Sequence, residues 1–382
     1  MIIEIRKVGF INKGAELMLL AILDKLRLKY PNAKFVMQPN HDDYINRAKL
    51  GLYQKVHFRR YNIRWDRLFY IIPSSIRKKF GMVMDDEVDI VLDATGFGYS
   101  DQWGTEYTNK TSFDIQMWKK NGTKVIFMPQ AFGPFNLKNI AIYFKTIVNQ
   151  ADLICVRDEM SYEYINNLVG DRENIKKFPD FTNLLTGVLP KDFSSEENKI
   201  CIVPNVRMQD MTSEKESNEY ANFMAKCVKI LYEADCKPFF LIHEGKKDLL
   251  LANEIIKIAE VEVNIILETD ALKIKGIIGS CDAMLGSRFH GLVNALSQGV
   301  PAIAIGWSHK YQMLLKDYSF EDGILNVTDD EEKINKVLLN LIDVEKRELI
   351  ASTLKTKSII QKEKVEQMWD EVYAIVDTVN NG

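Results

Sequence analysis

An arginine and a histidine stand together in the stretch GSRFHG, residues 286–291. The apolar run AMLG precedes them and the amphipathic stretch LVNALSQG follows, a pattern that predicts a strand, a turn and a helix. Such a turn exposes backbone N–H groups and the positive end of a helix dipole, which suits an anion. Arg288 would add a fork of donors and His290 a titratable proton. Alternatively, Arg288 pairs with a core carboxylate and His290 caps its own helix, and the turn alone does not separate these interpretations.

Further charged residues follow predicted strands in the same half of the chain. PNVR places Arg207 at one strand end, and LIHEGKKD places His243 and Glu244 at the next. Together with Arg288 and His290 they predict a rim that binds a phosphorylated or carboxylated small molecule, because arginine holds both groups through paired hydrogen bonds. Lys310 either joins this rim or is a solvated surface lysine.

Strand ends in the first half carry polar residues and glycines. In chain order they are Asn12, Gly14 and Glu16; Gly96, Gly98 and Gly104; Gln130 and Gly133; and Arg157, whose neighbour Asp158 or Ser161 would cap the next helix. No GxGxxG or Walker pattern occurs, so a dinucleotide fingerprint is absent. Three aromatic residues of the glycine-rich loop either stack on a sugar or pack the loop against its own domain: Phe97, Tyr99 and Trp103.

Short apolar strands alternate with helical patterns in both halves, which predicts an α/β fold of two Rossmann-like domains facing across a cleft. The stretch TGVLPKDFSSEENK loses its apolar periodicity and predicts a linker. We therefore expect an N-terminal domain over 1–186, a linker over 187–199, a second domain over 200–345 and C-terminal helices over 346–382.

Composition limits the function classes. The 382 residues carry a net charge of −3, without the basic excess of a general nucleic-acid binder. Charges interrupt the N-terminal MIIEIRKVGF and no apolar run is long enough to span a bilayer, so we expect a cytoplasmic protein. The five cysteines form no CxxC pair and are expected to be reduced and structural. No DxD pair or histidine cluster predicts a metal site.

The segment over residues 55–80 is unusually basic and aromatic. Its cations are Arg59, Arg60, Arg64, Arg67, Arg77, Lys78 and Lys79, and its aromatic residues include Tyr61, Trp65, Phe69 and Tyr70. A solvated helix accounts for the charges, and an interfacial helix on an anionic membrane accounts for the mixture.

Seven segments, taken in order, resemble the polysaccharide pyruvyl transferase family. They are NKGAE (12–16), PQAFGP (129–134), VRDEMS (156–161), PD (179–180), PNVR (204–207), LIHEGKKD (241–248) and SRFHGLVNALSQGVPAIAIGWSHK (287–310). The resemblance covers roughly residues 1–315, and its last segment is the most specific. The chain departs from the family's N-terminal motif, in which the acid neighbours the glycine, because Ala15 separates Gly14 from Glu16.

This resemblance implies a GT-B-like fold and transfer of pyruvate from phosphoenolpyruvate to two hydroxyls of a sugar, forming a cyclic ketal and releasing phosphate. Phosphoenolpyruvate is then a co-substrate, and no cofactor is expected. The implied roles are His290 as general acid; Arg207, Arg288, Phe289, Gly291, Lys310 and His243 around the donor; and Asn12, Glu16, Gly96, Gln130 and Arg157 around a sugar acceptor, which a lipid would carry.

Two rival functions remain open. A glycosyltransferase of the same fold would bind a nucleotide sugar, and Glu268 or Asp270 would contact its ribose. A non-catalytic scaffold of polysaccharide assembly would have kept the fold and lost the chemistry. The presence of Arg207, Arg288 and His290 together argues against the scaffold.

Overall fold

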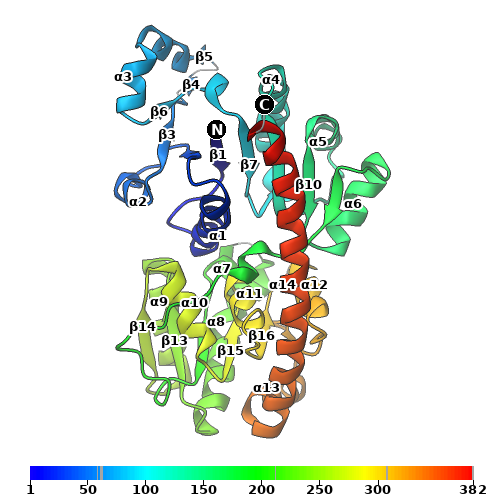
Figure 1. The fold of residues 1–382 in the computed structure, drawn as a ribbon. Coiled ribbons are helices and arrows are strands. Elements are labelled where there is room, and N and C mark those ends of the chain that lie inside the picture. The colour runs from blue at the N-terminus through cyan, green and yellow to red at the C-terminus, as the bar shows by residue number, and fades with distance from the viewer. Residues whose placement is uncertain (58, 61–62, 211, 307–308, 381–382) are drawn as a thin grey trace. The chain divides into compact units, whose positions relative to one another are not determined.

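The chain forms two α/β units, each built on a parallel sheet (Figure 1). This computed structural model describes residues 1–57, 59–60, 63–210, 212–306 and 309–380. The first unit comprises Met1–Ile11, Met18–Phe181 and Lys364–Gly382, and the second comprises Asn12–Leu17 and Thr182–Glu363. The predicted α/β class is confirmed.

The sheet of the first unit has the strand order β11-β10-β9-β7-β1-β2-β3-β6, and β8 pairs with β9. Its strands are β1 (Ile2–Arg6), β2 (Lys34–Met37), β3 (Tyr53–Lys55), β6 (Met82–Val83), β7 (Ile90–Asp93), β8 (Phe97–Tyr99), β9 (Lys124–Phe132), β10 (Leu153–Val156) and β11 (Ile175–Lys177). All their pairings are parallel, whereas β4 (Arg59–Arg60) and β5 (Ile63–Arg64) form a separate antiparallel pair. Every residue of β7 and β10 is buried, as expected for strands covered on both faces.

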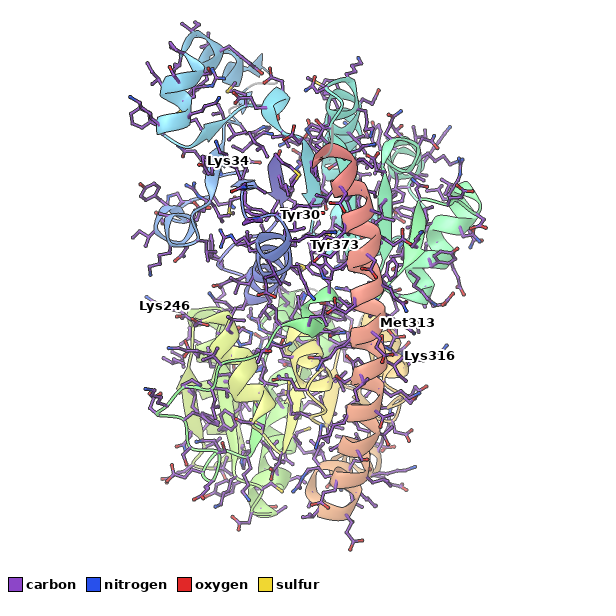
Figure 2. All side chains as sticks on the ribbon, viewed as in Figure 1. Tyr30, Lys34, Lys246, Met313, Lys316 and Tyr373 are labelled. Atoms are coloured by element: carbon purple, nitrogen blue, oxygen red, sulfur yellow. The ribbon has the colours of Figure 1, made fainter. Side chains whose placement is uncertain are left out.

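Helices connect these strands and return the chain to them. The connecting helices are α1 (Lys13–Lys29), α2 (Tyr44–Lys49), α3 (Ser74–Lys79), α4 (Thr105–Lys120), α5 (Lys138–Gln150) and α6 (Glu159–Val169), with short 3-10 turns η1 (Trp65–Ile71), η2 (Asp85–Glu87) and η3 (Asp101–Trp103). A fourth 3-10 turn, η4 (Phe181–Leu184), contains the point at which the chain passes from the first unit to the second. The C-terminal part of α14 (Val344–Asn380) also packs in this unit. There Tyr373 meets Tyr30 edge to face, with ring centroids 6.2 Å apart (Figure 2).

The sheet of the second unit has the order β14-β13-β12-β15-β16-β17, again with parallel pairings. Its strands are β12 (Ile200–Val203), β13 (Pro238–Ile242), β14 (Asn264–Leu267), β15 (Ala283–Gly286), β16 (Ala302–Ile305) and β17 (Ile324–Leu325). Its helices are α7 (Arg207–Asp210), α8 (Glu214–Glu233), α9 (Lys246–Ala259), α10 (Ala271–Gly279), α11 (Phe289–Leu296), α12 (His309–Asp317) and α13 (Glu331–Ile342).

Side-chain caps explain where several helices begin. The Asp158 carboxylate accepts a hydrogen bond from the Ser161 N–H (2.8 Å) at the start of α6, so Asp158 is the cap of the two predicted candidates. Ser213 and Glu216 form a reciprocal capping box at α8. These caps satisfy backbone N–H groups that lack a helical partner.

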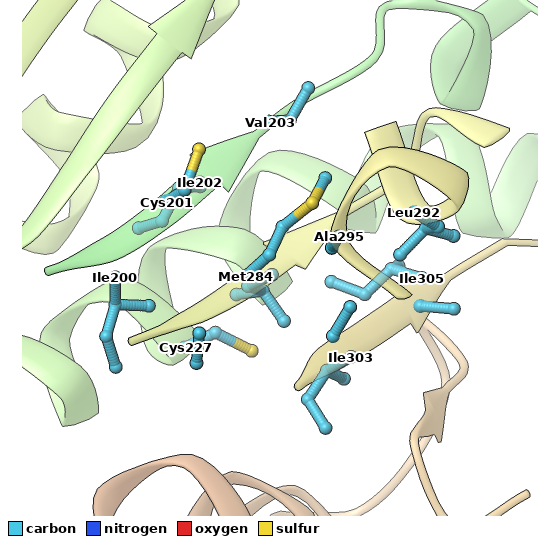
Figure 3. Close-up of a cluster of buried hydrophobic side chains, with 14 of the residues drawn as sticks. Ile200, Cys201, Ile202, Val203, Cys227, Met284, Leu292, Ala295, Ile303 and Ile305 are labelled. Atoms are coloured by element: carbon cyan, nitrogen blue, oxygen red, sulfur yellow. The ribbon is translucent and has the colours of Figure 1, made fainter. Parts of the chain in front are cut away.

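Strands and helices of the second unit enclose one apolar core. Figure 3 shows part of it, including Ile202 and Met284 on the central strands and Leu292 on α11. Cys201, Cys227 and Cys281 are buried in this cluster. All five cysteines are free, and burial raises the pKa of four of them, Cys155, Cys201, Cys227 and Cys236, as expected for structural thiols.

The unit boundaries differ from those that the sequence suggests. The second unit begins at Thr182, and residues 187–199 lie inside it instead of linking two domains. The Val188 N–H donates to the Leu272 carbonyl (2.9 Å), and Phe193 packs against Phe239. This segment has no apolar periodicity because it forms neither a helix nor a strand, although it packs against the second unit. Residues 346–380 all belong to the single helix α14. The part of α14 up to Glu363 belongs to the second unit, and the part from Lys364 onward belongs to the first unit.

Candidate functional site

The second sheet reverses its strand order between β12 and β15. From β12 the chain proceeds to β13 and β14 on one side, whereas β15 leads to β16 and β17 on the other. Open α/β sheets bind ligands outside the carboxyl ends of the strands at such a reversal. The residues that follow the two strands here are Pro204 and Asn205, and Ser287 and Arg288.

Buried hydrogen bonds fasten these two strand ends. The Asn205 amide Nδ2 donates to the Ser287 carbonyl (3.0 Å), and the Tyr311 hydroxyl donates to the same carbonyl (3.0 Å). The Tyr220 hydroxyl lies 2.8 Å from Ser287 Oγ, and burial raises the pKa of Tyr220 to about 12. The turn that presents Arg288 is therefore held from three directions.

Arg288 pairs with two carboxylates. It is the N-cap residue of α11, and its Nη1 and Nη2 atoms bond to Glu244 and Asp248. Asp248 also accepts the Val206 N–H (3.0 Å), and Glu244 accepts the Lys13 N–H (3.3 Å). Of the two interpretations that the sequence leaves open for Arg288, the structure shows pairing with carboxylates.

His290 lies beside Arg288 in the first turn of α11. Its ring meets the Phe289 ring edge to face, with centroids 5.5 Å apart, and it contacts Gly14. A Cβ atom on residue 14 would stand 2.1 Å from His290 Nδ1, closer than atoms can approach. The glycine of the NKGAE motif is therefore required by the histidine that packs on it.

The remaining predicted donor residues differ in how exposed they are and in what they contact. His243 is 8% exposed at the end of β13, and burial, aided by the charge of Arg288, lowers its pKa to about 3, so its ring is neutral at pH 7. Lys310 Nζ lies 5.5 Å from the centroid of the Phe289 ring, which also meets the His290 ring. Arg207 is 64% exposed and pairs with Asp210 (3.4 Å), and Gly291 is buried against Met284.

Two of the predicted acceptor residues belong to the second unit, not to the N-terminal domain. The Asn12 side chain accepts the Ala15 N–H (2.9 Å) and caps α1. Glu16 pairs with Lys13 (2.7 Å), and burial raises the pKa of the Glu16 carboxyl. The sequence could not assign these residues to the second unit, because only the first turn of α1 belongs to that unit and the rest of the helix belongs to the first.

The other predicted acceptor residues lie in the first unit. Gln130 is fully buried, and its Nε2 donates to the carbonyl and carboxylate of Asp93 (3.3 Å each). The Arg157 N–H donates to the Gln130 carbonyl (3.0 Å), while its buried side chain pairs with Asp180 (3.4 Å). Gly96 adopts φ +78, a conformation that favours glycine.

Tyr99 is fully buried against Phe127 and Phe132, so for this residue packing is the correct alternative. Trp103 is 49% exposed and meets Phe97 edge to face. Tyr61, Trp307 and Ser308 lie outside the described residues, as do the side chains of Arg59, Arg60, Arg64, Trp65 and Arg67.

A sequence model of the polysaccharide pyruvyl transferase family matches residues 12–309, most of the chain. The chain belongs to this family. The match includes Arg288 and its two partners, Glu244 and Asp248, and the predicted resemblance is confirmed. No curated protein matches the chain in sequence.

Solved structures show that the fold of this pyruvyl transferase family member is GT-B-like. Anabaena HepE in complex with UDP-glucose has 14% identity and a TM-score of 0.61, covering 97% of this chain and 99% of that one. A putative UDP-N-acetylglucosamine 2-epimerase from Listeria monocytogenes has 11% identity and a TM-score of 0.64, covering 99% and 97%. Acinetobacter baumannii MurG has 12% identity and a TM-score of 0.54, covering 100% and 99%. At these identities the likeness concerns the fold alone.

Sequence reasoning placed Glu244 on the rim but did not identify it as a partner of Arg288, and it missed Asp248 as the second partner. Asp248 and Glu244 stand 40 and 44 positions before Arg288, so no local pattern joins them. One signal was present: an acid in the first turn of α9, directly behind a strand end next to the reversal. No group of three or more His, Cys, Asp or Glu residues in the described ranges could hold a metal ion.

Proposed function

We propose that this protein transfers pyruvate from phosphoenolpyruvate to two hydroxyls of a sugar of a bacterial surface polysaccharide or its lipid-linked precursor. The observation that carries the proposal is the location of Arg288 and His290 at the strand-order reversal of the second sheet, within the residues that match the family. Lys310 Nζ lies over the ring of Phe289, the residue between them. Phosphoenolpyruvate presents a phosphate and a carboxylate, which suit separate cations.

The proposed chemistry balances without a cofactor. Protonation of the donor's methylene carbon makes the adjacent carbon an oxocarbenium-like electrophile, to which one sugar hydroxyl adds. Phosphate then leaves, and the second hydroxyl adds to the same carbon and closes the ring. Two C–O bonds to the sugar form and one to phosphate breaks, while the hydroxyl protons end on the new methyl group and on phosphate. Positioned acids and cations would lower this barrier.

Each residue has a proposed role in this reaction. His290 donates the proton to the methylene carbon or to the leaving phosphate, because it stands two residues after Arg288 in the first turn of α11. Arg207, the most exposed of the three, binds the donor at its rim. His290→Gln is therefore expected to lower kcat by about a hundredfold or more with little change in donor affinity. Arg207→Ala is expected to weaken donor binding about tenfold. Equal losses of kcat and of donor affinity in both variants would contradict this division of roles between His290 and Arg207.

The test of the proposed function is phosphate release from phosphoenolpyruvate with a panel of galactosides, glucosides and mannosides, followed by mass spectrometry of each sugar. A sugar heavier by one pyruvate ketal, formed together with phosphate, would establish the reaction. Melting temperatures with phosphoenolpyruvate and with UDP-sugars separate the rival glycosyltransferase, because a ligand stabilises the folded state that binds it. No shift with either class would favour the scaffold.

The structure offers little for the nucleotide-sugar alternative at its proposed acids. Asp270 accepts the N–H groups of Leu272 and Lys273 as the cap of α10. Glu268 accepts those of Thr269 (2.7 Å) and Asp270 (2.9 Å). One oxygen of each carboxylate is thus engaged by local backbone.

A further inference from the structure

The first sheet has its own strand-order reversal, between β1 and β7. From β1 the chain proceeds to β2, β3 and β6 on one side, and from β7 to β9, β10 and β11 on the other. By the rule that applies to the second sheet, a ligand is expected outside the carboxyl ends of these two strands. Lys7 follows β1, and Thr95 follows β7 after one residue.

Lys7 has an unusual backbone conformation for its position. Its φ of +62 lies in the left-handed region, which disfavours any residue with a Cβ atom. The other non-glycine residues with positive φ in the described chain lie in a turn or in the connection from a helix to the next strand: Asp42, Asp235, Lys237, Glu260 and Ser319. Lys7 instead follows a buried central strand directly. Strain of this kind persists where the surrounding structure enforces it, and it concentrates at ligand sites.

The conformation of Lys7 places its amine on an aromatic ring. Lys7 Nζ lies 4.4 Å from the centroid of Tyr107, near the start of α4. The Tyr107 hydroxyl bonds to Thr95 Oγ1 (2.7 Å) and reaches the Asp93 carboxylate (3.4 Å), which also accepts the Tyr99 hydroxyl (2.9 Å). Lys7 is exposed, Thr95 and Tyr107 are half-buried, and Asp93 is buried. A polar network thus leads from the surface to the strand end.

The charges around this network indicate the class of ligand. Among the described side chains around this network, four cations accompany four carboxylates: Arg6, Lys7, Lys55 and Lys110 with Glu4, Asp85, Asp93 and Asp114. A site for an anion would carry an excess of cations. A balanced site made of amine, phenol and hydroxyl groups suits a neutral ligand whose groups both donate and accept hydrogen bonds.

Two buried side chains of the network retain unused hydrogen-bonding capacity. Gln130 Oε1 and Arg6 Nη1 have no hydrogen-bond partner among the described residues, although Gln130 is fully buried and Arg6 is 8% exposed. Buried polar atoms without partners are uncommon and mark places where a further polar group would be stabilising. Gln130 bonds Asp93 directly, so this capacity belongs to the same network.

We propose that Lys7 and Tyr107 form a binding site for a neutral, hydroxyl-rich ligand at the carboxyl ends of β1 and β7. The amine donates to a ligand oxygen, and Tyr107 and Thr95 exchange hydrogen bonds with neighbouring hydroxyls. Identification of this ligand as the sugar acceptor rests on the proposed function, whereas the site itself does not.

Competitive acylation of lysines tests the site without requiring turnover. The full chain is labelled with acetic anhydride, with and without the methyl glycosides of galactose, glucose and mannose, and the rate at each lysine is read by peptide mass spectrometry. Although the Lys7 side chain as a whole is exposed, desolvation of its amine and the charge of Arg6 lower the pKa of Lys7, which favours its reaction. At least one glycoside is expected to slow the labelling of Lys7 several-fold.

Lys34 is the matched control. Its Nζ also lies over a tyrosine ring, 5.4 Å from the centroid of Tyr53, but it opens β2 at the amino end of the strand (Figure 2). The glycosides should leave its rate unchanged. An unchanged rate at Lys7 with every glycoside would overturn the site, and protection by inorganic phosphate in place of the glycosides would overturn the neutral ligand.

A second variant separates binding from folding. Lys7→Gly removes the amine and relieves the backbone strain, so it should fold and unfold at a temperature no lower than that of the unmodified chain. With turnover established, it should raise the KM for the acceptor and leave the KM for phosphoenolpyruvate unchanged. If phosphoenolpyruvate has no effect but glycosides still protect Lys7, the proposed donor fails and the site stands. Turnover with an unaltered acceptor KM in Lys7→Gly contradicts the assignment of the acceptor.

Discussion

At the scale of single residues, Glu244 occupies the position on Arg288 that the donor's anion would need. Both terminal nitrogens of Arg288 are paired, and Asp248 is the more deeply buried partner, with its other oxygen bonded to the Val206 N–H. Glu244 stands next to Gly245, whose φ is +114. Glu244 is therefore the carboxylate that should yield to the donor. Glu244→Gln is expected to tighten phosphoenolpyruvate binding about tenfold, ~1.4 kcal/mol, as measured by titration calorimetry.

Glu254→Gln provides the matched control for this effect. Glu254 is exposed on the same helix, α9, so the variant loses the same charge at a distance from Arg288. Its affinity for phosphoenolpyruvate should change little. Equal or weaker donor binding in Glu244→Gln would mean that Glu244 stays on Arg288 when the donor binds.

The buried His243 makes the stability of the second unit depend on pH. Its pKa is about 3 in the folded chain, whereas in the unfolded chain the imidazole takes up a proton below its ordinary pKa of about 6.5. The unfolded state thus binds more protons between these values, so the free energy of unfolding falls as the pH falls from about 6.5 to about 3. The slope is at most about 1.4 kcal/mol per pH unit.

Removal of this imidazole should flatten that dependence. Urea unfolding at pH 7 and pH 5 should show a smaller loss of stability in His243→Asn than in the unmodified chain. His41→Asn removes a fully exposed imidazole and serves as the control. Identical slopes in the unmodified chain and His243→Asn would show that the folded chain protonates His243 readily.

At the scale of elements, two glycines let the chain cross over α10 directly after the second unit begins. A Cβ atom on Gly276 would lie 2.3 Å from the backbone of Val188, and one on Gly187 would lie 2.4 Å from the backbone nitrogen of Gly276. Backbone cannot yield as a flexible side chain does. Gly276→Ala is therefore expected to destabilise the second unit by about 1–3 kcal/mol in thermal or denaturant unfolding. Lys273→Ala, exposed on the same helix, should cost much less. Similar losses in both would contradict the crossing.

The same crossing shows where sequence reasoning stops. Strands such as DIVLDATG and KVIFMPQ were predictable because a parallel strand covered on both faces is a short apolar run. Arg288 and His290 were predictable because local pattern places them after such a strand. The two reversals depend on which strands become neighbours, and the pairing of Arg288 with Glu244 joins positions 44 apart. A segment without periodicity, such as 187–199, reads as a linker whether or not it packs.

At the scale of the whole molecule, the chain leaves its first unit and returns to it. Residues 364–380 of α14 pack there through Trp369, which is fully buried and meets Phe181 edge to face. Lys25 and Tyr30 of the first unit bond to Glu366 (2.7 Å) and Asp377 (2.6 Å) on the same helix. The first unit is thus completed only by the last residues of the chain, a pairing that no local pattern predicts.

One segment of the first unit, residues 71–80, carries exposed apolar and basic side chains. Ile71 is 80% exposed and Phe80 is 66% exposed, and Lys78 and Lys79 of α3 are exposed between them in sequence. None of the described helices is both long and apolar enough to span a bilayer. Exposed apolar side chains beside lysines suit the surface of an anionic membrane, where apolar insertion and charge attraction add. We therefore expect the chain to bind vesicles that contain phosphatidylglycerol and to bind neutral phosphatidylcholine vesicles much less.

Vesicle flotation tests this segment with two double variants, one that removes apolar area and one that removes positive charge. Replacement of Ile71 and Phe80 by serine removes apolar area at constant charge, and replacement of Lys78 and Lys79 by glutamine removes charge at nearly constant shape. Each double replacement should reduce the floated fraction of the protein several-fold. For the lysine variant the reason is that each lysine near a charged leaflet contributes about 1 kcal/mol to membrane binding. High salt should reproduce only the second loss. Leu349→Ser, at a residue 71% exposed on α14, controls for loss of any exposed apolar side chain. Flotation that survives both replacements would place the membrane contact elsewhere.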